Sequence, residues 1–396
     1  MPPGAEVPLS MLVVFASAKL LSEIFERLGQ PGIVGEILAG VLIGPHALRW
    51  MAPNQALGIL SDLGVMFLLF RIGLEVRASE LFRVGGTAMA VACSGVGLSF
   101  VAGLIVATLW GAPRAEAVFT GAAMVATSVG ITAQVLASRR LLETRAAKII
   151  LAAAVADDVL GLIVLSLVTS FVRGRVNYLD ISLTAAIAVA FTGFMATVGH
   201  RTVQRVMPRV QARVRLAEGE FALAMTLLFA LALLAVYAGV AAIVGAFLAG
   251  MALGETVDQR VHQLTNGVTE LLVPFFLVGI GLRFDVSVFA TKTVLLMGVS
   301  IAAAAVAAKF TACSLAAFRV GRPDAIRVGV GMIPHGEVGM VVAQIGLSVG
   351  VMAQSVYGII VFMSVATTLL APPLLKLAFR QVMPAPGVSE EIAKIG

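Results

Sequence analysis

The chain has 396 residues, of which 59% are hydrophobic and 13% are charged, and its formal net charge is +6. Its mean hydropathy of +1.01 is too high for a water-soluble globule of this length, so we expect a protein embedded in a lipid bilayer. The 40 glycines favour helices that pack closely or break inside the membrane and argue against an open β architecture. Composition therefore predicts an all-α polytopic membrane protein.

About thirteen apolar segments reach the roughly 17–25 residues that are needed to cross a hydrocarbon core of about 30 Å. In chain order we expect them to begin near Pro8, Gly32, Ala56, Val84, Ala115, Leu142, Tyr178, Gly219, Val240, Leu264, Phe289, Ala325 and Ala353.

Basic residues are distributed unevenly over the connections between these segments. If the N-terminus lies outside, 19 of the 28 lysines and arginines fall on one side and six on the other. Because basic loops stay in the cytoplasm, we expect an inner (plasma) membrane protein with its N-terminus outside and its C-terminus cytoplasmic. The positive net charge is thus attributed to basic cytoplasmic loops and not to nucleic-acid binding.

The two halves of the chain share an internal repeat. The pattern IVGxxLAGxxxG at 33–44 recurs at 243–254, the tripeptide IGL at 72–74 recurs at 280–282, and VG at 129–130 recurs at 338–339. The matched segments are an odd number of spans apart, so the two copies must cross the membrane in opposite directions. Such an inverted repeat is typical of secondary transporters, whose substrate site lies near the midplane at the repeat interface.

Corresponding segments of the two halves carry helix-breaking residues at their centres. The span 115–137 contains TSVG at 127–130, and the span 325–350 contains PHGE at 334–337. We expect two crossed broken helices, in which Thr127 and Ser128 are candidate ligands and Gly130, Pro334 and Glu337 support the breaks. Two kinked helices without a ligand role remain the alternative.

The next span carries Asp157 and Asp158 in an otherwise uncharged stretch. An acidic residue at this depth costs about 2.5–3.5 kcal/mol on insertion scales, so the pair needs a partner or a watery cavity. The partner that we expect is Lys309, the only basic residue of the run 294–318. An ion pair between Lys309 and Asp157 would leave Asp158 to bind Na+ or H+, because oxygen ligands suit a hard cation. The alternative is that both acids only hold helices together.

The chain resembles the bacterial monovalent cation:proton antiporter-2 family, and most closely its sodium/proton antiporters with a double-aspartate motif. The resemblance rests on PGIVGEILAGVLIGP at 31–45, ATSVGIT at 126–132, the pair Asp157 and Asp158, Lys309, and HGEVG at 335–339. By this resemblance Asp158 is the essential ion-binding residue, Asp157 is the partner of Lys309, and Glu337 is the acid of the second broken helix. His335 departs from the arginine that the family often has, which would make a salt bridge there weaker and pH-dependent.

The resemblance also implies the organisation of one transmembrane unit, 1–396. Core ion-transport helices would lie in 84–172 and 289–380, dimerisation or scaffold helices in 8–77 and 219–283, and a linking helix in 178–200. It further implies a homodimer in which the core rises and falls past the scaffold.

Together these features predict a secondary antiporter that exchanges Na+, or alternatively Li+ or K+, for H+ by competition at Asp158. The exchange would be electrogenic if Lys309 also releases a proton. We expect no cofactor and no enzyme activity, since HExxH and GxSxG motifs and a Ser-Lys constellation are absent from the spans. Two alternatives stay open: a K+/H+ antiporter or K+ efflux protein of the same superfamily, and a non-transporting sensor on a transporter fold.

Overall fold

A computed structural model describes residues 6–28, 30–76, 78–172, 186–187, 190–191, 193–194, 202, 205, 218–254, 256–284 and 291–382. The side chains at 78–82, 162, 166, 169–172, 337 and 348 are outside this description. Most of the linking helix predicted at 178–200 also lies outside the described residues.

The described chain is helical, and its α-helices are α1 (Glu6–Arg27), α2 (Gly32–Ile43), α3 (Gln55–Glu75), α4 (Ala78–Leu109), α5 (Arg114–Ala123), α6 (Val129–Ser138), α7 (Arg145–Val172), α10 (Gly219–Tyr237), α11 (Ala242–Leu253), α12 (Gln259–Leu282), α13 (Lys292–Ala316), α14 (Arg322–Gly331), α15 (Glu337–Ser348) and α16 (Gln354–Ala378).

Seven of the helices in the described part are long and apolar enough to cross a membrane: α1, α3, α4, α10, α12, α13 and α16. The shorter apolar helices include α2, α6 and α11. The prediction of a polytopic helical membrane protein is therefore confirmed. The apolar span of α4 begins at Arg83, next to the predicted Val84, although the helix itself begins at Ala78. The start predicted near Leu264 was late, since α12 begins at Gln259 with a polar first turn.

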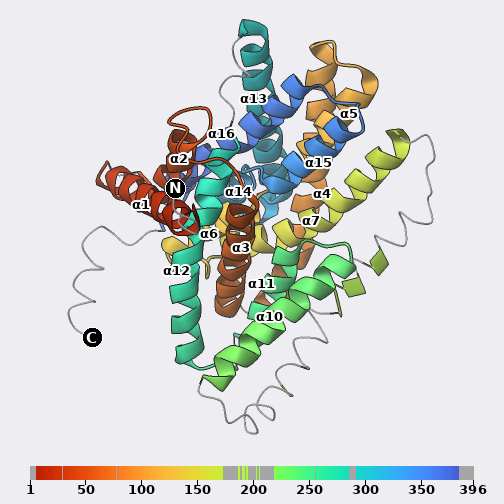
Figure 1. The fold of residues 1–396 in the computed structure, drawn as a ribbon. Coiled ribbons are helices and arrows are strands. Elements are labelled where there is room, and N and C mark those ends of the chain that lie inside the picture. The colour runs from red at the N-terminus through yellow and green to blue at the C-terminus, as the bar shows by residue number, and fades with distance from the viewer. Residues whose placement is uncertain are drawn as a thin grey trace.

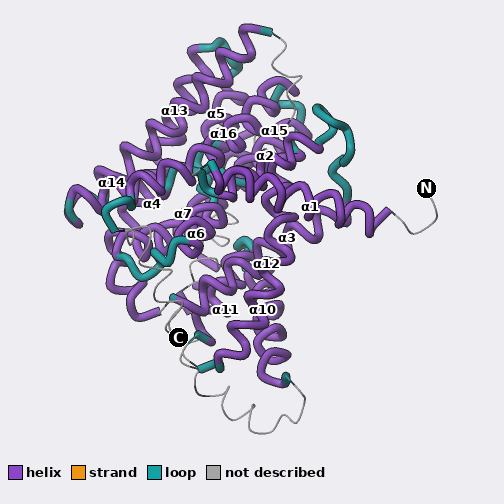
Figure 2. The backbone as a smooth tube through the Cα atoms, turned by 90° about the vertical axis from the view of Figure 1, so that its left-hand side faces the viewer, coloured by secondary structure: helices purple, strands orange, loops and turns teal. Residues whose placement is uncertain are grey.

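The helices pack in two groups (Figures 1 and 2). In one group α3 contacts α11 and α12, α2 contacts α1 and α12, and α10 contacts α11. In the other group α4 contacts α5, α7 and α13, while α16 contacts α6, α13, α14 and α15. We call the first group the scaffold helices and the second group the core helices.

The inverted repeat is visible in how glycines of the scaffold helices pack. A Cβ atom on Gly40 of α2 would overlap the carbonyl oxygen of Val278 on α12, and one on Gly250 of α11 would overlap that of Phe70 on α3. Gly40 and Gly250 are equivalent positions of the repeat. The same backbone-to-backbone contact therefore occurs once in each half, as expected where small residues let membrane helices approach closely.

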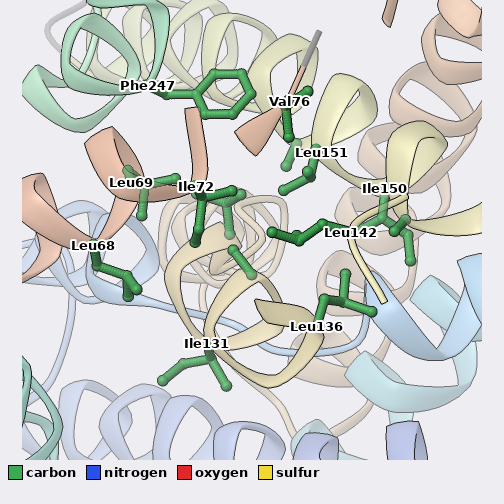
Figure 3. Packing of buried hydrophobic residues seen from close by; sticks show 14 of the residues in the cluster. Leu68, Leu69, Ile72, Val76, Ile131, Leu136, Leu142, Ile150, Leu151 and Phe247 are labelled. Carbon is green, nitrogen blue, oxygen red and sulfur yellow. The ribbon is translucent and has the colours of Figure 1, made fainter. Parts of the chain in front are cut away.

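An apolar cluster fills the boundary where scaffold helices α3 and α11 meet core helices α6 and α7 (Figure 3). Its labelled members are Leu68, Leu69, Ile72, Val76, Ile131, Leu136, Leu142, Ile150, Leu151 and Phe247. All ten are buried. We call them the boundary cluster, because they lie where the two groups of helices meet.

Candidate functional site

The two interrupted helices cross at their breaks. α5 ends at Ala123 and α6 begins at Val129, while α14 ends at Gly331 and α15 begins at Glu337. At the crossing the amide of Ser128 donates to the carbonyl oxygen of Pro334 at 2.7 Å. Thr127 and His335 form an isolated antiparallel bridge. The predicted pair of crossed broken helices is thus present, and backbone groups freed at one break bond to the other.

His335 holds this crossing by hydrogen bonds on three sides. Its ring Nε2 lies 3.0 Å from the carbonyl oxygen of Met124, and a carbonyl only accepts, so Nε2 carries the proton. Its amide donates to Oγ1 of Thr367 at 3.1 Å, and its carbonyl accepts from Oγ1 of Thr368 at 3.2 Å. His335 is fully buried, and these contacts give it a structural role at the crossing.

Asp157 and Lys309 form a buried ion pair between α7 and α13. The Nζ atom of Lys309 lies 3.2 Å from Oδ1 and 3.3 Å from Oδ2 of Asp157, and both side chains are 0% exposed. Oδ2 also accepts a hydrogen bond from the amide of Thr127 at 2.8 Å. Asp157 therefore ties α13 to the first break, and its charge is balanced by one cation and one backbone dipole.

Asp158, the next residue, points in another direction, because successive helix residues are turned by about 100°. It is 5% exposed and lines two small cavities. One of these is also lined by Thr127, Ser128 and Gly336 from the two breaks. Each cavity has a volume of about 10 Å³, about the room that one water molecule needs.

An orphaned oxygen lies at the same place. Oγ1 of Thr127 is buried and has no hydrogen-bond partner among the described residues, although buried polar atoms are normally satisfied. With the carboxylate of Asp158 it supplies hard oxygen donors beside a space of single-ion size. Arg145, the first residue of α7, is 13 residues before Asp158, or about 20 Å along the helix. The site is thus deep in the bundle.

Scaffold helices supply part of the wall of both cavities. Val65, Ile243 and Phe276 close the cavity at the breaks, and Leu69 and Phe247 of the boundary cluster close the second. Gly130 lies where a Cβ would come within 3.2 Å of Val65 and 3.3 Å of Phe276. The site therefore lies where the core helices touch the scaffold helices.

A much larger cavity of about 500 Å³ opens between the same two groups of helices at another place. It is lined by residues of the connection from α2 to α3, of the end of α12, and of α15 and α16, namely Pro45, His46, Pro53, Leu282, Arg283, Met340, Val341, Gln344 and Tyr357. It touches the connection before α3, whereas the boundary cluster lies around the last turns of that helix.

Most of the residues singled out in the sequence come together here. Asp157, Asp158, Thr127, Ser128, Lys309 and Pro334 meet around the crossing, and Glu337 opens α15 with its side chain outside the described part. Sequence reasoning missed the hydroxyls that secure the crossing, Thr367, Thr368 and Thr132, whose Oγ1 donates to the carbonyl of Gly331 at 2.7 Å. One signal could have found the first two, because Thr367 and Thr368 follow Asp157 and Asp158 by 210 residues.

The chain is similar in sequence and in fold to known antiporters. A profile of the transmembrane sodium/hydrogen exchanger family matches residues 12–381. The Na+/H+-K+ antiporter GerN of Bacillus cereus is 33% identical over 377 residues, covering 93% of this chain and 95% of the relative. The high-affinity Na+/H+ antiporter NhaS3 of Synechocystis is 32% identical over 424 residues, covering 95% and 90%. The structure of the sodium proton antiporter MjNhaP1 from Methanocaldococcus jannaschii superposes with a TM-score of 0.74 at 16% identity, covering 98% and 99%.

Proposed function

The chain belongs to the sodium/hydrogen exchanger family, and on that premise we propose that Na+ and H+ compete for one carboxylate, that of Asp158. As a member of this family it is a multi-pass membrane antiporter of Na+ and H+. The observation that carries the proposal is that the two neighbouring aspartates of α7 have different surroundings. Asp157 is paired with the buried cation Lys309, whereas Asp158 lines the small cavities at the crossing.

Competition at a single carboxylate would couple the two ion flows. With a proton or a Na+ ion bound, the site carries no uncompensated negative charge when it moves across. An empty, charged Asp158 would have to be buried against the apolar walls of Val65, Ile243 and Phe276, which costs several kcal/mol. The empty site should therefore stay on its side, so each Na+ that crosses one way requires protons to cross the other way.

Alternating access would come from movement of the core against the scaffold. We assign the core to 84–172 and 289–380 and the scaffold to 8–77 and 219–283, as the resemblance implies. The position of the site at the boundary between these two groups of helices supports the assignment. The apolar boundary cluster would seal the site toward one side of the membrane, while the 500 Å³ cavity would lead toward the other.

Orientation and assembly are part of the same proposal. The N-terminus would lie outside and the C-terminus in the cytoplasm of the plasma membrane, as the excess of basic residues on one side indicates. The boundary cluster then lies on the cytoplasmic side. The scaffold would pair with that of a second copy and so hold the moving core in the bilayer.

K+ is the second candidate for the exchanged cation. The relative GerN is named as an antiporter of Na+ and H+ that also involves K+. A site built from a carboxylate, hydroxyls and carbonyls selects ions by its size and ligand number, so the same residues would serve either cation. The two readings differ only in which ion is carried.

The proposal is tested by proton movement in proteoliposomes that carry a pH gradient, with Na+, Li+ and K+ added in turn. We expect Na+ to dissipate the gradient in the wild type and to fail in Asp158→Asn. Asp258→Asn is the matched control, because Asp258 precedes α12 and its side chain makes no capping bond. This variant should behave as wild type.

A response to K+ alone would favour the second candidate. Activity that survives in Asp158→Asn would refute competition at this residue, and a wild type that moves no protons with any cation would favour the sensor reading.

A further inference from the structure

Thr367 and Thr368 on α16 occupy the same place in the second repeat as Asp157 and Asp158 occupy on α7 in the first. α16 begins 209 residues after α7. At the offset of 210 residues that relates 33–44 to 243–254, the aspartate pair falls on the threonine pair. The other matches of the repeat have offsets of 208 and 209 residues, so the sequence places the threonine pair within two residues of the position equivalent to the aspartate pair, and the hydrogen bonds decide the register.

The hydrogen bonds at the crossing follow the same symmetry. Thr127 and His335 pair with each other in the antiparallel bridge, and they are separated by 208 residues. The amide of Thr127 donates to Oδ2 of Asp157 at 2.8 Å. The amide of His335 donates to Oγ1 of Thr367 at 3.1 Å. Each bridge residue thus gives its amide to the long helix of its own repeat, a carboxylate in one case and a hydroxyl in the other.

The threonine pair fixes the backbone of His335 at both its amide and its carbonyl group. Thr367 accepts from the amide of His335 and donates to the carbonyl of Ser364 at 3.2 Å. Thr368 donates to the carbonyl of His335 at 3.2 Å. Both threonines are buried, at 0% and 1% exposed. All of these hydrogen bonds lie within the buried crossing, where water cannot take the place of a lost partner.

This peptide adjoins the wall of the cavity at Asp158. The residue before His335 supplies the carbonyl that accepts from Ser128, and the residue after it is Gly336, which lines the cavity with Asp158. A Cβ on Gly336 would lie 2.8 Å from Cβ of Ser128, so the two breaks are in close contact. A shift of the second break would therefore change the shape of the cavity.

We propose that Thr367 is a positioning residue for the cation site and the uncharged counterpart of Asp157. The inference rests on the proposed function, because it assigns a role in the same site. A hydroxyl suits this place, since a second carboxylate would add a buried charge that Lys309, already bonded to Asp157, could not balance. Thr368 supports the same peptide from its other end.

The test compares Thr367→Val, which keeps the shape but loses the acceptor, with Thr367→Ser, which restores it. Proton movement driven by Na+ in proteoliposomes gives KM and maximal rate for each. We expect Thr367→Val to raise the KM for Na+ about tenfold, with a smaller change in maximal rate, and Thr367→Ser to stay within about twofold of wild type. Thr120→Val is the matched control. Thr120 is also fully buried, but its hydroxyl donates to the backbone carbonyl oxygen of Glu116 on its own helix. The KM of Thr120→Val for Na+ should therefore be that of the wild type.

The inference is overturned if Thr367→Val keeps the wild-type KM, or if Thr367→Ser is impaired as much as Thr367→Val. If Thr367→Val does not elute as a folded protein in detergent, Thr367→Ala replaces it, because alanine also lacks the acceptor without burying a second methyl group, and the same criterion applies. The two failures are distinguishable. An inactive wild type refutes the proposed function, whereas an active wild type with an unaffected Thr367→Val refutes this inference alone.

Discussion

Asp157 and Asp158 are chemically identical neighbours with different surroundings. Asp157 is held by the ammonium of Lys309 and the amide of Thr127, whereas Asp158 faces small cavities at the boundary of the two helix groups. This difference is the physical basis of the proposal that the exchanged ion binds to Asp158.

Replacing Lys309 by methionine should destabilise the protein strongly. The buried carboxylate of Asp157 would lose its cation, and breaking a buried pair from one side costs about 3–5 kcal/mol. The double variant Asp157→Asn with Lys309→Met removes both charges and should recover much of this loss. Thermal unfolding in detergent measures the effect, with Lys292→Met at the exposed start of the same helix as control. Equal unfolding temperatures for Lys309→Met and Lys292→Met would contradict the account.

The charged members of the site and the hydroxyls at the first break could be predicted from the sequence, whereas the hydroxyl pair on α16 stands out only through its place in the repeat. Asp157, Asp158 and Lys309 stand out because charge inside an apolar span is costly and therefore rare. Thr367 and Thr368 do not, because threonine in a helix can satisfy its hydroxyl on its own backbone. Only the fold brings their hydroxyls to the peptide of His335.

At the scale of the helix, the half-helices α5, α6, α14 and α15 are 10, 10, 10 and 12 residues long, too short to span a membrane alone. Their interruption could be predicted from the proline and glycines in the apolar spans. The bond between Ser128 and Pro334 could not, because it joins residues 206 positions apart, and local sequence carries no information on such a pairing.

Close packing of the scaffold helices predicts a sharp difference between two glycines. Gly250→Ala should destabilise the protein by about 1–3 kcal/mol, because the new Cβ would overlap the carbonyl of Phe70 and force α11 away from α3. Gly58→Ala on α3 meets no atom within 4 Å and should be neutral or up to about 1 kcal/mol stabilising, since alanine favours the helix. Unfolding temperatures in detergent decide this, and a Gly250→Ala variant as stable as Gly58→Ala would show that the helices are not in contact there.

The whole molecule carries its repeat in two different ways. The scaffold contacts around Gly40 and Gly250 are nearly the same in both halves, which suits a rigid frame. At the crossing, the carboxylates of one half are matched by hydroxyls in the other, so the overall architecture is symmetric while its chemistry is not.

We propose that the whole transport cycle is electrogenic. If Lys309 releases a proton when Na+ disrupts its pair with Asp157, two protons cross for each Na+ and one net charge moves per cycle. A membrane potential then contributes about 2.3 kcal/mol per 100 mV. Electrophysiology on supported membranes should record a current when Na+ is added to wild type, and none for Asp158→Asn. Exchange that proceeds in liposomes without any current or voltage dependence would exclude this stoichiometry.

Na+ and H+ must exclude one another at Asp158 if they compete for its carboxylate. Calorimetric titration of the purified protein with Na+ across a series of pH values tests it most directly. We predict that Na+ binding releases protons and that, at pH values low enough to protonate Asp158, the apparent Kd rises at least about tenfold for each pH unit lowered. Asp158→Asn should bind no Na+. An apparent Kd that does not change with pH, or Na+ binding by Asp158→Asn with wild-type affinity, would contradict the account.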